Sequence, residues 1–312
     1  MESVRRAVID VGTNSVKLLV ADVAGRQVIP VHEESKQTRL GQGFYETQLL
    51  QPESIARTAR AVAILADNAR ALHPATLRVV ATSAARDAKN PDDLAAAIRA
   101  STNLRTEIIS GEQEAEWSFQ GVTTAARFAQ TSLLILDVGG GSTEFIVGRG
   151  QHQHLACSFP LGTVRLLEKF PHGDPPAATE FAACHDWVVS FLSKEVRPHL
   201  EDVLHSDSLP GPLLLVGTGG SATILARMEL RQAHFDREAI ENVHLSVDRI
   251  KHLRAHLWSL PLAQRQEIPG LPRNRADVIL MGIAIYEAVM VVFGIPQLHA
   301  STRGLRFAAV MD

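Results

Sequence analysis

The sequence has 312 residues, of which 46% are hydrophobic and 21% are charged, and its formal net charge is -3. This length exceeds the size at which a single hydrophobic core usually stops growing, so two domains are expected. The lack of a net basic charge argues against a nucleic-acid coat or a membrane-surface protein. Cys157 and Cys184 give neither a metal pattern nor a disulfide framework, which is typical of a reducing cytoplasm.

Residues 9–20 and 136–147 repeat one pattern. In each, an apolar run ends in Asp-x-Gly, passes through small polar residues and resumes as a second apolar run, which predicts a β-hairpin. One such turn is also typical of an ordinary tight hairpin, but two matched copies indicate a shared task. Consecutive N–H groups and hydroxyls in these turns suit phosphate oxygens. The candidate phosphate-binding residues are Gly12, Thr13, Asn14 and Ser15, and Gly139, Gly140, Gly141, Ser142 and Thr143.

Acidic residues end the first strand of each predicted hairpin. Because hydrated Mg²⁺ is usually held by one or two carboxylates, Asp10 and Asp137 are candidate metal ligands. The thirteen histidines show no spacing typical of a zinc site, so zinc is not expected. The segment before Asp10 is not the apolar region of a signal peptide.

The rest of the first half alternates between helical and strand patterns. Apolar spacing predicts a helix over 53–72 and a strand over 77–82, and a short strand is expected over 106–109. Asn90-Pro91 has the pattern of a helix start. Ser110 and Gln113 have the spacing of a capping box, which predicts a helix running to about Ala129. The domain boundary is then expected at about residue 130, giving domains 1–130 and 131–312.

Glu114 lies about one turn into this helix. A lone carboxylate above Trp117 and small residues would be poorly solvated, which suits a general base. The alternative is an acidic helix start favoured by the helix dipole, and the pattern alone favours that alternative. Arg86 has two interpretations as well: a surface arginine, or a clamp for phosphate oxygens.

In the second half, a buried strand over 213–216 enters a third glycine-rich turn that precedes a helix. The turn matches the dinucleotide pattern G-x-G-x-x-A, but residues 228–249 are polar rather than a second strand ending in an acidic residue. A phosphate or nucleotide loop at a helix N-terminus is therefore preferred, with Gly217, Thr218, Gly219 and Gly220 as candidates. Residues 205–212 are expected to form a loop.

The segment 278–295 is almost wholly apolar and has the composition of either a membrane span or a buried helix. It contains Glu287, is short for a span and has no aromatic or basic anchors. A buried helix is predicted, and no membrane partner is expected.

Eight motifs occur in an order that resembles the exopolyphosphatase/guanosine pentaphosphate phosphohydrolase (Ppx/GppA) family over nearly the whole chain. They are residues 10–15, 81–86, 109–115, 137–144, 160–165, 216–222, 275–277 and 301–306. The resemblance implies the α/β fold of the actin, heat-shock protein 70 and sugar kinase superfamily. That fold has two ribonuclease-H-like lobes, each with a mixed five-stranded sheet, which face an interdomain cleft.

The resemblance also implies roles for single residues. Glu114 matches the family's catalytic glutamate, which reverses the preference for a mere helix start, and Arg86 matches its phosphate-binding arginine. Asp137 and Glu144 match the acidic residues associated with Mg²⁺ and the terminal phosphate, and Asp10 opens the first phosphate loop. Glu144 is thus both a catalytic and a metal-binding candidate.

The expected function is Mg²⁺-assisted release of terminal phosphate from inorganic polyphosphate, with guanosine pentaphosphate as the alternative substrate. A kinase would need an acceptor pocket for which the chain has little spare length. A sensor that binds without turnover would be expected to lose Glu114 or Glu144. A cytoplasmic homodimer that binds no nucleic acid is expected, in the compact form without a helical HD-type domain.

Three places depart from the family pattern. Lys17 stands where relatives more often have His or Arg. Thr302 replaces an Asp of the last motif, and Phe307 and Ala308 replace its Glu-Gly. These departures leave both phosphate loops intact.

Overall fold

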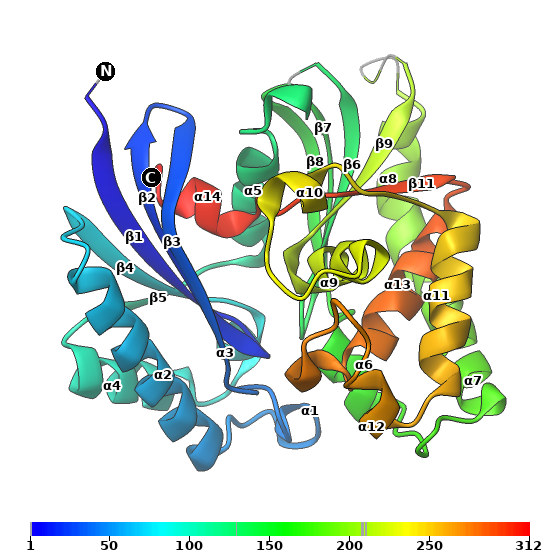
Figure 1. The fold of residues 1–312 in the computed structure, drawn as a ribbon, viewed down its shortest axis with the longest axis horizontal. Helices are drawn as coiled ribbons and strands as arrows, with labels where there is room; N and C mark the ends of the chain where they lie inside the picture. The colour runs from blue at the N-terminus through cyan, green and yellow to red at the C-terminus, as the bar shows by residue number, and fades with distance from the viewer. Residues whose placement is uncertain (1, 129, 207–208, 210) are drawn as a thin grey trace. The chain divides into compact units, whose positions relative to one another are not determined.

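The structure is a computed structural model that describes residues 2–128, 130–206, 209 and 211–312. The chain forms two compact units (Figure 1): residues 1–125 together with 303–312, and residues 126–302. The chain therefore passes between the units twice. Each unit is built around its own sheet.

The N-terminal unit contains a five-stranded sheet with the order β3-β2-β1-β4-β5. β1 pairs antiparallel with β2 and parallel with β4, so the predicted hairpin of residues 9–20 is confirmed. The predicted strands over 77–82 and 106–109 are confirmed as β4 and β5, each slightly displaced or shorter. The strands are β1 (Val4–Val11), β2 (Ser15–Ala24), β3 (Gln27–Gln37), β4 (Thr76–Ala81) and β5 (Thr106–Ile108).

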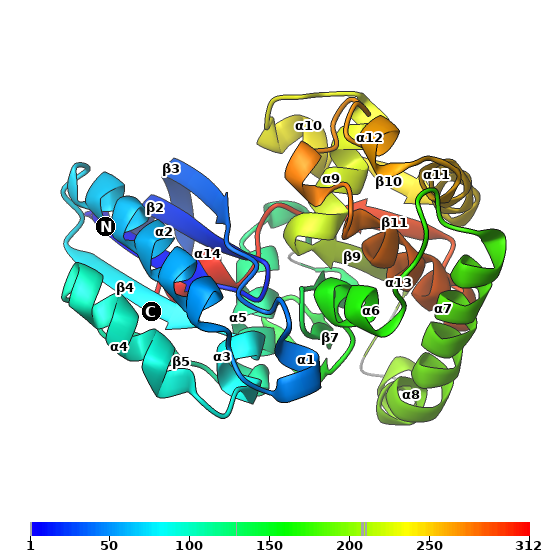
Figure 2. The ribbon, with the colours of Figure 1, turned by 90° about the horizontal axis from the view of Figure 1, so that it is seen from below.

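Helices cover both faces of this sheet (Figure 2). Alternate side chains of β1 point to opposite faces: Ile9 packs with α2 and α4, whereas Val8 packs with Trp117 of α5. The helix predicted over 53–72 is confirmed as α2. The helices between the strands are α1 (Phe44–Thr47), α2 (Pro52–Arg70), α3 (Ser83–Asp87), α4 (Pro91–Thr102) and α5 (Gly111–Val122).

The start of α5 is as predicted, but its end is not. The Ser110 hydroxyl accepts a hydrogen bond from the Gln113 amide at 3.1 Å. The helix ends at Val122 rather than near 129, because the hydroxyls of Thr123 and Thr124 donate to carbonyl oxygens of the preceding turn and so compete with helix continuation. A 3-10 turn, η1 (Ala126–Phe128), follows, and Ala129 lies outside the described residues.

The last ten residues belong to the N-terminal unit, whereas residues 131–312 were expected to form one domain. Helix α14 (Leu305–Ala309) lies against α5, where a Cβ atom on Gly121 would come within 2.2 Å of the Gly304 carbonyl oxygen. Phe307, one of the departures from the family pattern, is fully buried there. The return of the chain is thus fixed by close helix packing.

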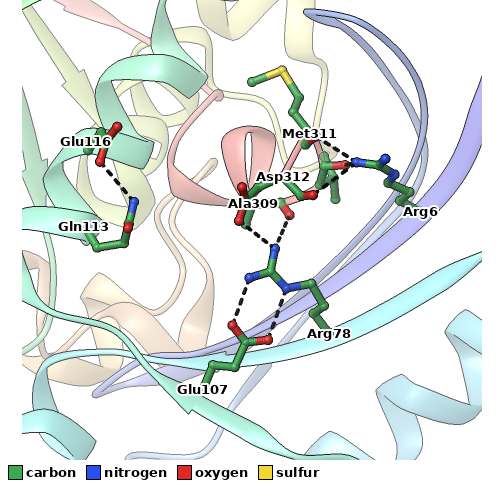
Figure 3. Close-up of polar contacts among 9 residues, drawn as sticks. Arg6, Arg78, Glu107, Gln113, Glu116, Ala309, Met311 and Asp312 are labelled. Carbon is green, nitrogen blue, oxygen red and sulfur yellow. Dashed lines mark hydrogen bonds and ion pairs between the residues drawn. The ribbon is translucent and has the colours of Figure 1, made fainter.

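Two arginines of the N-terminal sheet bind the end of the chain (Figure 3). Arg6 donates to the Met311 carbonyl oxygen at 2.7 Å, and Arg78 donates to that of Ala309 at 3.3 Å. Arg78 also binds Glu107 through two nitrogens and lies 5.5 Å from the centre of the Trp117 ring. Hydrogen bonds from β1 and β4 therefore hold residues 309–311 against the N-terminal sheet.

The C-terminal unit has a six-stranded sheet with the order β10-β11-β9-β6-β7-β8. Five of these strands, in the order β8-β7-β6-β9-β11, repeat the order of the N-terminal sheet, with an antiparallel β6–β7 hairpin and the parallel pairs β6–β9 and β9–β11. The expectation of five strands in each lobe is wrong here, because β10 adds an antiparallel edge to β11. The strands are β6 (Ser132–Val138), β7 (Thr143–Arg149), β8 (His152–Phe159), β9 (Leu213–Thr218), β10 (His244–Ser246) and β11 (Gln297–Ala300).

Helix α13 (Ile279–Val292) lies in the core of this unit, with every residue from 279 to 290 buried. This confirms the buried helix predicted from the apolar run. Glu287 is tolerated there because Arg254 binds its carboxylate through two nitrogens. No helix among the described residues is long and apolar enough to cross a membrane.

The helices of this unit are α6 (Thr163–Lys169), α7 (Ala178–Phe191), the π-helical η2 (Leu192–Val196), α8 (Arg197–Leu204), α9 (Gly219–Leu230), α10 (Arg237–Glu241), α11 (Val247–Ser259), α12 (Leu262–Arg265), η3 (Arg273–Arg275) and α13 (Ile279–Val292). The predicted strand and following helix around the third glycine-rich turn are confirmed as β9 and α9. Of the loop expected over 205–212, residues 207, 208 and 210 lie outside the described part of the chain.

Candidate active site

The first phosphate-loop candidate is the turn between β1 and β2. The Gly12 amide donates to the Ser15 carbonyl oxygen at 3.0 Å, which closes the turn. The carbonyl oxygens of Thr13 and Asn14 accept hydrogen bonds from backbone amides of residues 38–41. Because these acceptors are engaged within the protein, the amide and hydroxyl donors are the groups that suit an anion.

Two side-chain groups in this turn have no hydrogen-bond partner among the described residues. They are the Thr13 hydroxyl and the Asn14 amide nitrogen Nδ2, and both atoms are buried. The other end of the Asn14 side chain is fixed, since Gln37 donates to its Oδ1 at 3.2 Å. Buried polar groups are rarely left without a partner. This turn therefore fits a ligand with hydrogen-bond acceptors, as a phosphate has.

The second turn, between β6 and β7, has the same closure. The Gly139 amide donates to the Ser142 carbonyl oxygen at 3.0 Å, and the amide of Val164 at the start of α6 donates to the Gly140 carbonyl oxygen at 2.8 Å. A Cβ atom on Gly162 would lie 2.4 Å from that same oxygen. The motif over 160–165 thus supports the second turn by direct backbone contact.

The two hairpins differ in charge at one matched position. Asp10 pairs in register with Lys17, whereas Asp137 pairs with Glu144. Side chains directly opposite on antiparallel strands point to the same face, with Cβ atoms about 5 Å apart. The first hairpin therefore places a cation beside its aspartate, and the second places two carboxylates together.

The Glu144 carboxylate is held inside the C-terminal unit. The residue is only 1% exposed. Its Oε1 accepts hydrogen bonds from the hydroxyls of Ser142, at 2.8 Å, and Ser158, at 2.7 Å. Ser158 lies on β8 and was not singled out from the sequence, because only the register of β8 against β7 places it there.

The third glycine-rich turn lies against Asp137. Gly219 has a φ of +80°, and a Cβ atom at this position would lie 2.5 Å from Asp137 Oδ1. The pKa of Tyr286 is well above its usual value, because burial disfavours the phenolate and the Asp137 carboxylate adds a nearby negative charge. Its hydroxyl donates to the Thr218 carbonyl oxygen at 3.4 Å. The structure thus brings residues 217–220 and 137–144 together.

In the N-terminal unit, Arg86 and Glu114 form an ion pair. Arg86 Nη1 lies 2.8 Å from Glu114 Oε2, and Glu114 is 7% exposed. The predicted burial of Glu114 is therefore confirmed, but the interpretation of it as a lone carboxylate is wrong, because the Arg86 guanidinium contacts it. The surface interpretation of Arg86 is wrong as well, since its side chain is mostly buried against Glu114.

The candidate metal ligands are carboxylates rather than histidines or cysteines. Among the described residues, no three or more histidine, cysteine or acidic side chains lie together so that they could hold a metal ion. Mg²⁺ nevertheless needs only one or two carboxylates together with water and substrate oxygens. The register pair of Asp137 and Glu144 fits that requirement better than Asp10, whose register partner is Lys17.

The sequence is similar to known phosphatases. Residues 19–311 match the Ppx/GppA phosphatase family. The chain is 35% identical over 300 residues to exopolyphosphatase 2 of Mycobacterium tuberculosis, covering 92% of this chain and 90% of that protein. It is 28% identical over 308 residues to exopolyphosphatase 1 of Mycobacterium bovis, covering 98% of this chain and 87% of that protein.

Solved structures of members of the same family are similar to this chain. The Aquifex aeolicus Ppx/GppA family member is 27% identical, with a TM-score of 0.78 over 99% of this chain and 97% of that one. An exopolyphosphatase from Cytophaga hutchinsonii is 25% identical, with a TM-score of 0.86 over 97% of this chain and 96% of that one. The expected two-lobe fold of the actin, heat-shock protein 70 and sugar kinase superfamily is thereby confirmed, and the chain belongs to the Ppx/GppA phosphatase family.

Proposed function

We propose that the chain is an exopolyphosphatase, a hydrolase that releases terminal phosphate from inorganic polyphosphate. The observation that carries this proposal is the Arg86–Glu114 pair, found together with both phosphate hairpins in a chain 35% identical to a named exopolyphosphatase. A buried carboxylate held at a fixed position suits a general base that accepts the proton of a water molecule. The family membership and the buried Glu144 support the same conclusion.

The N-terminal unit supplies the general base in this proposal. Glu114 accepts the proton of the attacking water, and Arg86 fixes the position of its carboxylate by a hydrogen bond. The turn of residues 12–15 binds phosphate oxygens through amides and hydroxyls. Phosphoryl transfer depends mainly on positioning and charge neutralisation, which fits this set of groups.

The C-terminal unit supplies the groups that would hold Mg²⁺, namely Asp137 and Glu144, with phosphate oxygens at residues 139–143 and 217–220. When bound, the ion neutralises charge on the phosphate oxygens. Asp10 as a further metal ligand stays a prediction. Its register partner Lys17 suits direct contact with an anion instead.

The compartment and the assembly also belong to this proposal. A cytoplasmic location is favoured because Cys157 and Cys184 form no disulfide. A homodimer stays a prediction, which light scattering of the purified protein checks.

The experiment compares phosphate release from long-chain polyphosphate and from guanosine pentaphosphate, each with Mg²⁺ and with a Glu114→Ala control. We expect a higher kcat/KM for polyphosphate, and release that disappears in the variant. Preference for guanosine pentaphosphate would assign the alternative substrate. Binding of either compound by folded protein without release would instead identify a sensor.

A further inference from the structure

Three side chains of the C-terminal sheet form a row across adjacent strands. Asp137 on β6 pairs with Glu144 on β7, which pairs with Ser158 on β8. Residues in direct register on antiparallel strands point to the same face, so the row continues from the two carboxylates to one hydroxyl. A slip of β8 by one residue would turn that hydroxyl to the other face.

The hydroxyls of Ser158 and Ser142 bind the same oxygen of Glu144, Oε1, at 2.7 and 2.8 Å. Both distances are those of well-formed hydroxyl hydrogen bonds. The terminal torsion of a glutamate is broad and soft, so the carboxylate plane needs external contacts to fix it. Two donors from different elements, one in the turn and one on the edge strand, supply those contacts.

We propose that Ser158 is a positioning residue that fixes the Glu144 carboxylate in the orientation needed to hold a divalent cation beside Asp137. This inference rests on the proposed function only in that the carboxylate pair takes such a cation. Partners of this kind commonly change metal affinity by 10- to 100-fold when they are removed. Ser142 belongs to the phosphate turn itself, whereas Ser158 lies outside every glycine-rich motif.

The test uses Mn²⁺ as a paramagnetic probe of the full chain, with bound ion counted by electron paramagnetic resonance in the absence of polyphosphate. We expect Ser158→Ala to weaken Mn²⁺ binding about ten-fold. Ser158→Thr keeps a hydroxyl on a strand that favours β-branched residues, so it should restore binding to within about two-fold of the original protein. Ser193→Ala is the control, because its hydroxyl donates to a helix carbonyl at an exposed site.

Thermal unfolding of each variant without metal separates misfolding from lost positioning. Equal Mn²⁺ affinity in Ser158→Ala and the original protein would overturn the proposal, as would an original protein that binds no Mn²⁺ at millimolar concentration. Phosphate release is measured separately. If the original protein releases phosphate but Ser158→Ala binds Mn²⁺ with unchanged affinity, only the role of Ser158 is overturned. If the original protein releases no phosphate but Ser158→Ala shows the expected loss of Mn²⁺ affinity, only the exopolyphosphatase function is overturned.

Discussion

Arg86 Nη1 lies 2.8 Å from Glu114 Oε2, so the catalytic candidate of α5 is paired with an arginine of α3, 28 residues earlier in the chain. Arg86 also donates to the Ile109 carbonyl oxygen at 3.3 Å, just before α5 begins. One guanidinium therefore orients the carboxylate and anchors the start of its helix. Loss of either partner should affect the same step of the reaction.

We expect Glu114→Gln to lower kcat for polyphosphate by about 10²–10³, with a smaller change in KM, because an amide cannot accept the proton of the attacking water. Arg86→Ala should lower kcat to a similar extent. Because the two residues act as a unit, the double variant should be little worse than either single variant. Fully additive losses in steady-state kinetics would show that the pair does not act together.

Substitution of Gly219 tests the contact between the third glycine-rich turn and Asp137. In Gly219→Ala the new methyl group would displace the Asp137 carboxylate, from which it would lie 2.5 Å, in addition to the strain of a φ of +80°. Gly294→Ala is the matched control, because its φ is +66° and no atom lies within 4 Å. Both variants should lose about 1–2 kcal/mol of stability through backbone strain. Only Gly219→Ala should also lose most phosphate release, so equal activity in the two would contradict the described contact.

The contacts of Arg78 with the end of the chain should contribute to the stability of the N-terminal unit. Its guanidinium binds Glu107 and the Ala309 carbonyl oxygen and lies over Trp117. We expect Arg78→Ala to lower the free energy of unfolding by about 1–3 kcal/mol, because several partly buried contacts are lost together. Arg273→Ala breaks an exposed pair with Glu267 and should cost less than about 1 kcal/mol. Urea unfolding measures both, and similar losses would contradict this account.

His299 gives a prediction for the pH dependence of stability. Its pKa is lowered to about 4 by burial, by the facing His244 and by Arg127. Below pH 6.5 the His299 side chain is protonated in the unfolded chain but stays neutral in the folded chain. The free energy of unfolding therefore keeps its full contribution from His299 above pH 6.5 and loses it as the pH falls towards 4. Because the ring is partly exposed to solvent, we expect His299 to contribute only about 1 kcal/mol to this pH dependence of the free energy of unfolding.

The variant His299→Gln has no titrating group at this position and should show a flatter decline of the thermal unfolding midpoint between pH 6.5 and 4. His256→Gln, which changes an exposed histidine of α11, is the control and should follow the original protein. A decline that is the same in all three proteins would rule out His299 as its source.

The structural features that could be predicted from the sequence are those set by residues close together in the chain. The two hairpins, the Ser110 start of α5 and the buried helix α13 follow from turn chemistry, capping and apolar runs. The third turn was distinguished from a dinucleotide site by the polar residues 228–249 that follow it in the chain. Each of these features is set by residues within one or two elements.

Contacts between distant segments were not predictable in this way. The Arg86–Glu114 pair depends on two helices that only the folded sheet brings together. The Ser158–Glu144 contact depends on the register of β8, and the return of residues 303–312 depends on the fit of Gly121 against Gly304. Sequence patterns carry no signal for strand register or for the partner of a C-terminal helix.

The most direct test of the central claim follows the products of long-chain polyphosphate with Mg²⁺ over time, for the original protein and for Glu114→Gln. We predict that orthophosphate is the product released, from the chain ends, and that the Glu114→Gln variant releases it at least about 10²-fold more slowly. Equal rates for the two proteins, or no orthophosphate from the folded original protein, would contradict the assignment of this chain as an exopolyphosphatase that uses Glu114.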